Sequence, residues 1–91
     1  MKTIKQQVTI GFDETNDALV TVSPAQAGSG VSVELISPVK RQYGEHIYNL
    51  ILSTVKELEY TDLHIAVQDK GAWDYALKAR IATALERGSA E

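Results

Sequence analysis

The 91 residues, 44% of them hydrophobic and 23% charged, predict one cytoplasmic domain over residues 1–91 that is too small for a deep catalytic cleft. Nine Lys and Arg against twelve Asp and Glu give a net charge of -3, which argues against a nucleic-acid partner, and no apolar run predicts a membrane span or a signal peptide. The lack of cysteine excludes disulfides and a protein thiol nucleophile, and only two histidines, with no carboxylate cluster near them, predict no metal site.

The chain begins with a pattern typical of a β-hairpin. Apolar residues occupy every second position of 7–12 and again of 18–23, which predicts two strands with one buried face each. Phe12 belongs to the apolar set of the first strand. The polar residues 13–17 between the strands are typical of a turn, and we expect Thr15 near its tip.

A small-residue loop at 24–30 leads to a third alternating segment, 31–36, which predicts another strand. Ser37 and Pro38 then have the features of an N-cap followed by a proline at the first helical position. Apolar residues at helical spacing follow and form one continuous stripe, so we predict a helix that ends near Tyr60.

The last third of the chain predicts a strand and a helix. Residues 63–68 alternate between apolar and polar, and Asp69 then stands where a helix N-cap would be. Trp73 shares the apolar face of this helix and is expected in the core, and Gly88 is expected to close the helix. The element order β-β-β-α-β-α predicts an α+β fold in which two helices cover one face of a small, mostly antiparallel, four-stranded sheet.

Three stretches of sequence carry a family resemblance: GFDETND at 11–17, VKRQYGEHI at 39–47 and DKGAWDYALKAR at 69–80. In order and spacing they resemble the acyl carrier proteins of citrate lyase, the small gamma subunits of that complex. The family has Gly, two variable residues, Glu, Ser, a variable residue and Asp in the first stretch. It has Val-Lys-Lys-Gln-Phe-Gly in the second, and Asp-Lys-Gly-Ala-Leu-Asp followed by Ala-Arg in the third.

The resemblance implies a carrier without catalytic residues of its own. An acetyl or citryl thioester would travel on a 2'-(5''-phosphoribosyl)-3'-dephospho-CoA arm, joined by a phosphodiester to a hydroxyl of the hairpin. Thr15 stands where the family has serine; it keeps the hydroxyl, and its β-methyl group crowds the oxygen. The implied partners are the citrate lyase alpha (CoA-transferase) and beta (lyase) subunits, which cleave citrate to acetate and oxaloacetate, and a prosthetic-group transferase.

Two acidic residues flank the expected attachment point. Glu14 and Asp17 match acidic positions of the family pattern, and they would position the loading enzyme or its magnesium ion. Acidic residues are also common in turns for solvation alone, and the sequence does not choose between these interpretations. The end of the hairpin, together with the turn at Lys70 and Gly71, is the expected surface for protein partners.

Two basic residues in the third stretch have a functional and a structural interpretation. Lys70 and Arg80 are cations suited to the phosphates of an arm, and arginine binds such groups through two donors. In the structural interpretation, which is the more common one for surface cations, Lys70 is a solvated turn residue. Arg80 then pairs with a carboxylate such as Asp74 or Glu34.

Other functions fit the sequence less well or need an experiment to separate them. The carrier subunit of malonate decarboxylase uses a similar prosthetic group, and the stretch at 69–80 favours the citrate lyase family over it. A non-catalytic interaction subunit that has lost the arm is a second alternative. A hydrolase built on His46 or His64 is disfavoured because no nucleophile-elbow pattern is present.

Overall fold

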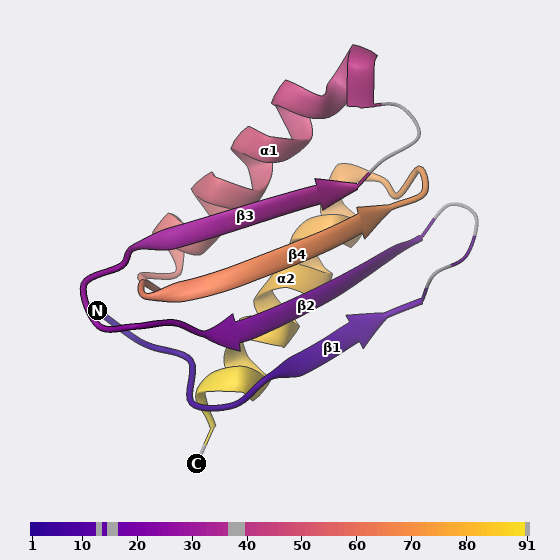
Figure 1. Cartoon of the computed structure of the whole chain (residues 1–91). Coiled ribbons are helices and arrows are strands. Elements are labelled where there is room, and N and C mark those ends of the chain that lie inside the picture. Colours follow the sequence, from indigo (N-terminus) through magenta and orange to yellow (C-terminus); the bar gives the residue numbers. More distant parts are fainter. Residues whose placement is uncertain (13, 15–16, 37–39, 91) are drawn as a thin grey trace.

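The computed structural model describes residues 1–12, 14, 17–36 and 40–90 (Figure 1). Its elements follow the order that the sequence predicts. None of the helices in these ranges is long and apolar enough to cross a membrane. The elements are β1 (Val8–Gly11), β2 (Ala18–Pro24), β3 (Val31–Ile36), α1 (Lys40–Glu57), β4 (Leu63–Asp69) and α2 (Asp74–Ser89).

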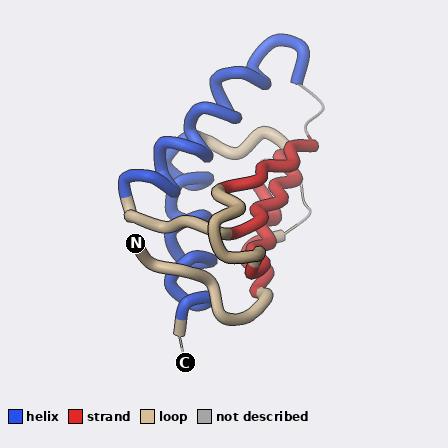
Figure 2. Tube along the Cα trace, turned by 60° about the vertical axis from the view of Figure 1, so that its left-hand side comes forward, coloured by secondary structure: helices blue, strands red, loops and turns tan. Residues whose placement is uncertain are grey.

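The four strands form one sheet in the order β1-β2-β4-β3. β1 pairs with β2 and β2 with β4 in antiparallel fashion, whereas β3 and β4 are parallel because α1 carries the chain from one to the other. Both helices lie on the same face of the sheet, as the turned view makes clear (Figure 2). The predicted α+β fold, with a mostly antiparallel sheet and two helices on one face, is confirmed.

The core lies between the sheet and the two helices. Alternate residues of β2 and β4 point into it, which is the direct consequence of the period of two in their sequences. The stripes of α1 and α2 cover these residues, and each side chain removed from water contributes roughly 1.5–3 kcal/mol to folding. The most deeply buried large side chains are Val20, Val22, Ile51, Val55, Leu63, Ile65, Val67, Leu77, Ile81 and Leu85.

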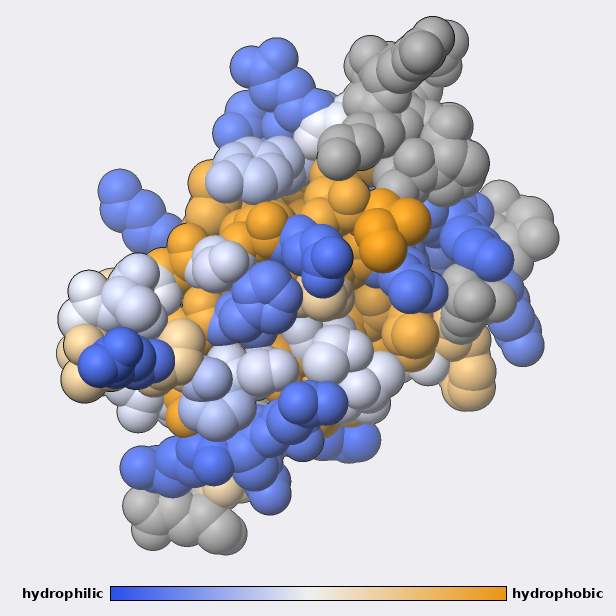
Figure 3. All heavy atoms as spheres, in the orientation of Figure 1, coloured by the Kyte–Doolittle hydropathy of each residue, from blue (hydrophilic) through white to orange (hydrophobic). Residues whose placement is uncertain are grey.

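The opposite face of the sheet is uncovered and largely polar. The Thr9 and Thr21 hydroxyls are 3.0 Å apart across the β1–β2 pair, and His64 Nδ1 lies 3.1 Å from the Ser32 hydroxyl across β3–β4. Hydrophilic and intermediate residues gather over the middle of this face (Figure 3). This placement explains why the polar members of the alternating pattern need no buried partner.

The first helix ends close to the predicted position. α1 stops at Glu57, and Glu59 adopts a left-handed φ of 65°. The Tyr60 N–H then donates to the Val55 carbonyl at 3.1 Å and the Glu59 N–H to the Lys56 carbonyl at 3.0 Å, which is the Schellman pattern of helix termination. The predicted cap at Ser37 and Pro38 lies outside the described residues.

The start of the last helix differs from the prediction. Asp69 is the last residue of β4, and its carboxylate oxygen Oδ1 accepts the N–H groups of Gly71 (3.2 Å) and Ala72 (3.0 Å). Gly71 has a φ of +95°, so the chain makes a turn there, and α2 starts only at Asp74 with Trp73 as its N-cap residue. The predictions that Asp69 caps the helix and that Trp73 lies in the core were wrong: Trp73 precedes the helical repeat and is 70% exposed.

The end of the last helix also differs. Gly88 was expected to close α2, but it lies within the helix, and Ala90 is the C-cap residue. A Cβ atom on Gly88 would come within 3.0 Å of a Val22 methyl group, and the Gly88 carbonyl accepts the N–H of Lys5 at 2.8 Å. The glycine is therefore suited to close packing of the N-terminal segment against the helix rather than to termination.

Candidate functional site

One end of the sheet gathers three of the chain's connections. β1, β3 and β4 all end there and β2 begins there, and the turn from β4 to α2 lies at the same end (Figure 1). Two of the three stretches that carry the family resemblance, 11–17 and 69–80, are hydrogen-bonded to each other at this end. This end of the sheet is the candidate site and is called the loop end.

The β1–β2 connection leaves the sheet at a glycine. Gly11 has a φ of +103°, and a Cβ atom there would lie 2.0 Å from the Ala18 carbonyl oxygen. No other residue type fits this backbone without a shift. Because the chain departs here, Phe12 does not continue the alternation of β1 and is 59% exposed, so its predicted place among the inward-facing residues was wrong.

Asp17 fixes the other side of this connection. Its carboxylate accepts the Ala18 N–H at 2.7 Å and two bonds from Arg80 of α2, from Nη2 at 3.0 Å and from Nε at 3.3 Å. The Ala18 N–H and the Arg80 guanidinium outweigh partial burial and hold the pKa of Asp17 below its ordinary value of 3.8. Arg80 thus pairs with a carboxylate, as the structural interpretation predicted, but its partner is Asp17 rather than Asp74 or Glu34, because α2 presents this guanidinium to the β1–β2 connection.

Backbone hydrogen bonds join the two connections at the loop end. The Asp17 N–H donates to the Glu14 carbonyl at 3.1 Å, and the Lys70 N–H donates to the Asp17 carbonyl at 3.0 Å. The structure thus brings Glu14, Asp17 and Lys70 together, beside Arg80, with the side chains of Glu14 and Lys70 exposed. Thr15 lies outside the described residues.

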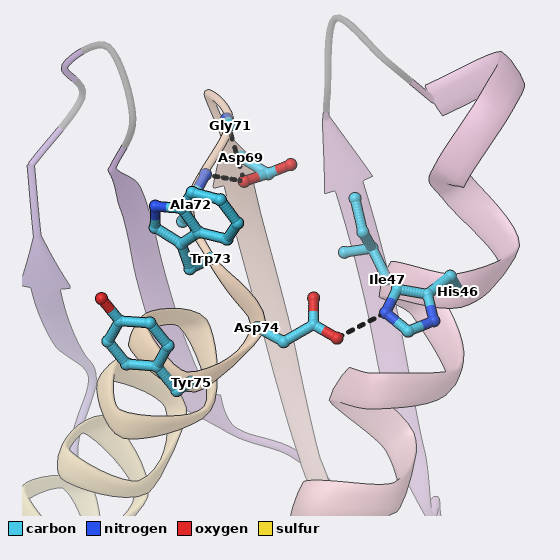
Figure 4. A pocket seen from close by; sticks show the side chains of 8 residues that line it. All are labelled: His46, Ile47, Asp69, Gly71, Ala72, Trp73, Asp74 and Tyr75. Carbon is cyan, nitrogen blue, oxygen red and sulfur yellow. Dashed lines mark hydrogen bonds and ion pairs between the residues drawn. The ribbon is translucent and has the colours of Figure 1, made fainter.

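A cavity of about 780 Å³ lies beside the β4–α2 turn, where α1 faces the start of α2 (Figure 4). Asp74 projects toward α1, and its Oδ2 lies 2.6 Å from His46 Nε2. Trp73 and Tyr75, on either side of Asp74, project away from α1, and Tyr75 is 76% exposed. The lining residues are His46, Ile47, Asp69, Gly71, Ala72, Trp73, Asp74 and Tyr75.

Sequence reasoning did not identify this cavity. Trp73 and Tyr75 are two positions apart, about 200° around a helix, so they cannot both face a core if both are helical. That signal pointed to at least one exposed ring. Among the described residues, no group of three or more His, Asp or Glu side chains is placed to hold a metal ion.

Comparison with known proteins shows which family the chain belongs to. The family model described as malonate decarboxylase delta subunit (MdcD) matches residues 5–88. The citrate lyase acyl carrier protein of Halothermothrix orenii is 40% identical over 94% of this chain and 89% of its own length. The equivalent protein of Fusobacterium nucleatum is 43% identical over 87% of this chain and 83% of its own length. The chain belongs to the citrate lyase acyl carrier protein family.

The fold of this family member also occurs in a solved assembly. A chain in the crystal structure of a Pseudomonas malonate decarboxylase hetero-tetramer in complex with malonate superposes with a TM-score of 0.81. The match covers 94% of this chain and 87% of the other at 19% sequence identity, which supports a shared fold. The acyl carrier family and the malonate decarboxylase chain therefore have the same arrangement of strands and helices.

Proposed function

We propose that residues 1–91 form a single acyl carrier domain of a citrate lyase complex, which carries acetyl and citryl groups as thioesters in the cytoplasm. The groups would be held on a 2'-(5''-phosphoribosyl)-3'-dephospho-CoA arm attached to Thr15. The observation that carries the proposal is the 40% identity to a citrate lyase acyl carrier protein over 94% of the chain. In this proposal the domain itself makes and breaks no bond of citrate.

The described residues at the loop end fit a covalent arm. Phe12 and Glu14, which precede position 15 by three residues and by one, have exposed side chains, so this end is open to a loading enzyme. Asp17, at the end of the connection, is held by two hydrogen bonds from Arg80, which supports attachment at a defined place on the domain. Thr15 would hold the arm through its hydroxyl oxygen, and Glu14 and Lys70 are the exposed charged groups proposed to support it.

The physical advantage of such a carrier is a high effective concentration of the acyl group at each active site. The arm supplies the terminal thiol on which the acyl group is carried, and the protein supplies the anchor. A tether whose length matches the distance between two active sites gives an effective concentration that reaches about the millimolar range. The chain contains no cysteine, so it offers that thiol no internal partner for a disulfide.

The proposed partners are the alpha (CoA-transferase) and beta (lyase) subunits and a prosthetic-group transferase. Trp73 is 70% and Tyr75 76% exposed, and both follow the β4–α2 turn, whose Lys70 N–H is hydrogen-bonded to the Asp17 carbonyl. Aromatic residues are enriched in the contact surfaces of protein complexes because they bury a large area with few rotatable bonds. We propose that partner subunits contact this end, so that docking and delivery of the arm occur together.

Intact-mass spectrometry tests the attachment. Protein produced together with its loading enzymes should gain the mass of one arm, and Thr15→Val should stay unmodified while it remains folded, because valine lacks only the hydroxyl. Thr15→Ser should load at least as fast as the natural chain, because the serine oxygen is less crowded. An unmodified natural chain that still assembles with the partner subunits would support an interaction subunit without an arm.

A carrier subunit of malonate decarboxylase is the second candidate. The description of the matching family model and the fold match to the Pseudomonas assembly favour it, whereas the sequence identity to citrate lyase carriers favours the first candidate. The acyl group decides between them: the loaded protein should accept citryl or acetyl groups from citrate lyase subunits. Turnover with malonate decarboxylase subunits alone would reverse the assignment.

A further inference from the structure

Arg80 contacts both sides of the connection that contains position 15. Its guanidinium carbon lies 5.8 Å from the centroid of the Phe12 ring, a cation–π distance, and its Nε and Nη2 donate to the two carboxylate oxygens of Asp17. Phe12 precedes and Asp17 follows the expected attachment residue in the sequence. One side chain from α2 thus joins both ends of this short segment to the helix layer.

The geometry of the pair favours a role in setting position. Two N–H donors on one planar guanidinium fix direction as well as distance, which a single lysine nitrogen does not do. The Arg80 and Asp17 side chains are 35% and 21% exposed, so the pair is sheltered without belonging to the core. The core face of α2 is held separately by Leu77, Ile81 and Leu85, which are buried.

A reaction at the hydroxyl of a loop depends strongly on where that loop is held. Misplacement by about 1 Å costs on the order of 100-fold in a reaction that needs alignment. The Asp17 N–H also donates a hydrogen bond to the Glu14 carbonyl, and the Asp17 carbonyl accepts one from the Lys70 N–H. A shift of Asp17 would therefore also shift Glu14 and Lys70. Arg80 therefore contacts the two described residues, Phe12 and Asp17, that flank this connection.

We propose that Arg80 is a positioning residue for prosthetic-group loading: its two-donor bond to Asp17 and its contact with Phe12 hold the β1–β2 connection so that the hydroxyl at position 15 meets the loading enzyme. This inference rests on the proposed attachment at Thr15. In this proposal Arg80 acts without touching the arm or the loading enzyme. Arg80 acts through Asp17, and its effect is on the rate of loading.

The test measures loading rates by the time course of mass gain for the natural chain and for variants. Arg80→Gln should lower kcat/KM for loading at least 10-fold. Arg80→Lys keeps the charge but loses the two-donor geometry, so its kcat/KM for loading should lie between those of the natural chain and Arg80→Gln. Lys78→Gln is the matched control: Lys78 lies on the same helix and pairs with Glu57 at 3.1 Å, away from the connection, so its loading should stay within twofold of the natural rate.

Two further measurements separate positioning from loss of folding. Val67→Ala removes core packing in β4 and should lower the unfolding temperature at least as much as Arg80→Gln while loading at the natural rate. Asp17→Asn combined with Arg80→Gln should load no more slowly than the slower single variant, because both changes break the same contact.

The outcomes separate this inference from the proposed function. If the natural chain loads and Arg80→Gln loads within twofold of it, the positioning role is overturned and the carrier function stands. Equal losses in Val67→Ala and Arg80→Gln would also overturn it, since stability alone would then explain the effect. If the natural chain gains no mass at all, the attachment fails and this inference fails with it.

Discussion

The two ends of the sheet each have a connection organised by an aspartate, and they use different donors. At the far end, the Asp62 carboxylate accepts the Gly30 N–H at 3.0 Å, and backbone N–H groups of Gly30 and Gly28 hold the pKa of Asp62 below its ordinary value. At the loop end, Asp17 accepts one backbone N–H and two bonds from Arg80. Backbone donors order the β2–β3 connection around Asp62, whereas Arg80 joins the β1–β2 connection to a helix.

The glycines of the two ends differ in the same way. Gly11 and Gly28 both have positive φ values, but a Cβ atom on Gly11 would meet the Ala18 carbonyl oxygen at 2.0 Å, and one on Gly28 would meet nothing within 4 Å. The far end therefore needs glycine for backbone conformation alone, while the loop end also needs it for space. Gly11 is therefore the more constrained of the two positions.

The largest expected effect follows from this difference. Gly11→Ala should destabilise the fold by about 3 kcal/mol or more, because the new methyl group collides with backbone in addition to the unfavourable φ. Gly28→Ala should cost only about 1–2 kcal/mol, the ordinary penalty for a left-handed residue with a side chain. Urea unfolding of both variants measures the two values. Similar losses for the two would show that the loop end is no more constrained than the far end.

An effect of intermediate size is expected on folding stability at low pH. Both aspartates have folded-state pKa values below 3.8, so in each case the unfolded chain binds a proton at higher pH than the folded chain. Their contribution to stability is therefore full above about pH 4 and is lost as the pH falls through the lower, folded-state value. Asp17→Asn and Asp62→Asn should each make the loss of stability below pH 4 less steep, as followed by circular dichroism.

Salt should affect the pKa values of the two aspartates differently. Part of the pKa shift of Asp17 comes from the charge of Arg80, which salt screens, while the shift of Asp62 comes from backbone N–H groups and a hydroxyl. In 0.5 M NaCl, a concentration at which screening acts over roughly 4 Å, an NMR titration should show a smaller shift for Asp17 and little change for Asp62. Equal responses would mean that Arg80 adds little to the carboxylate's environment.

The smallest effect is expected at Trp73. Because it precedes α2 and is mostly exposed, Trp73→Ala should change the free energy of unfolding by no more than about 0.5 kcal/mol. Leu77→Ala, one helical turn further on and buried, should cost about 2–5 kcal/mol. Thermal unfolding of the two variants makes the comparison, and a large loss at Trp73 would place its ring in the core after all.

Sequence reasoning was accurate where a repeat runs without interruption. The period of two in β2 and β4 and the helical stripe of α1 predicted the strands, the helix and their buried faces. It was wrong at Phe12 and Trp73 for one physical reason: a glycine with positive φ, Gly11 or Gly71, turns the chain just before each aromatic residue. Periodicity contains no information on where a glycine will interrupt it.

The site was only partly predictable. Glu14, Asp17 and Lys70 were singled out from their place in the family pattern, and the structure places them together through backbone bonds. The partner of Arg80 was not predictable, because Asp17 lies 63 positions away and several carboxylates were equally available in the sequence. Long-range side-chain pairs depend on the packed fold, which local patterns do not specify.

The most direct test of the account is to locate the modification by fragmentation mass spectrometry. Tryptic cleavage after Lys5 and Lys40 yields the peptide 6–40, which contains Thr15 together with other hydroxyl residues. The account predicts that the mass of one prosthetic arm lies on Thr15 of this peptide. An arm on a different hydroxyl of the chain would contradict it.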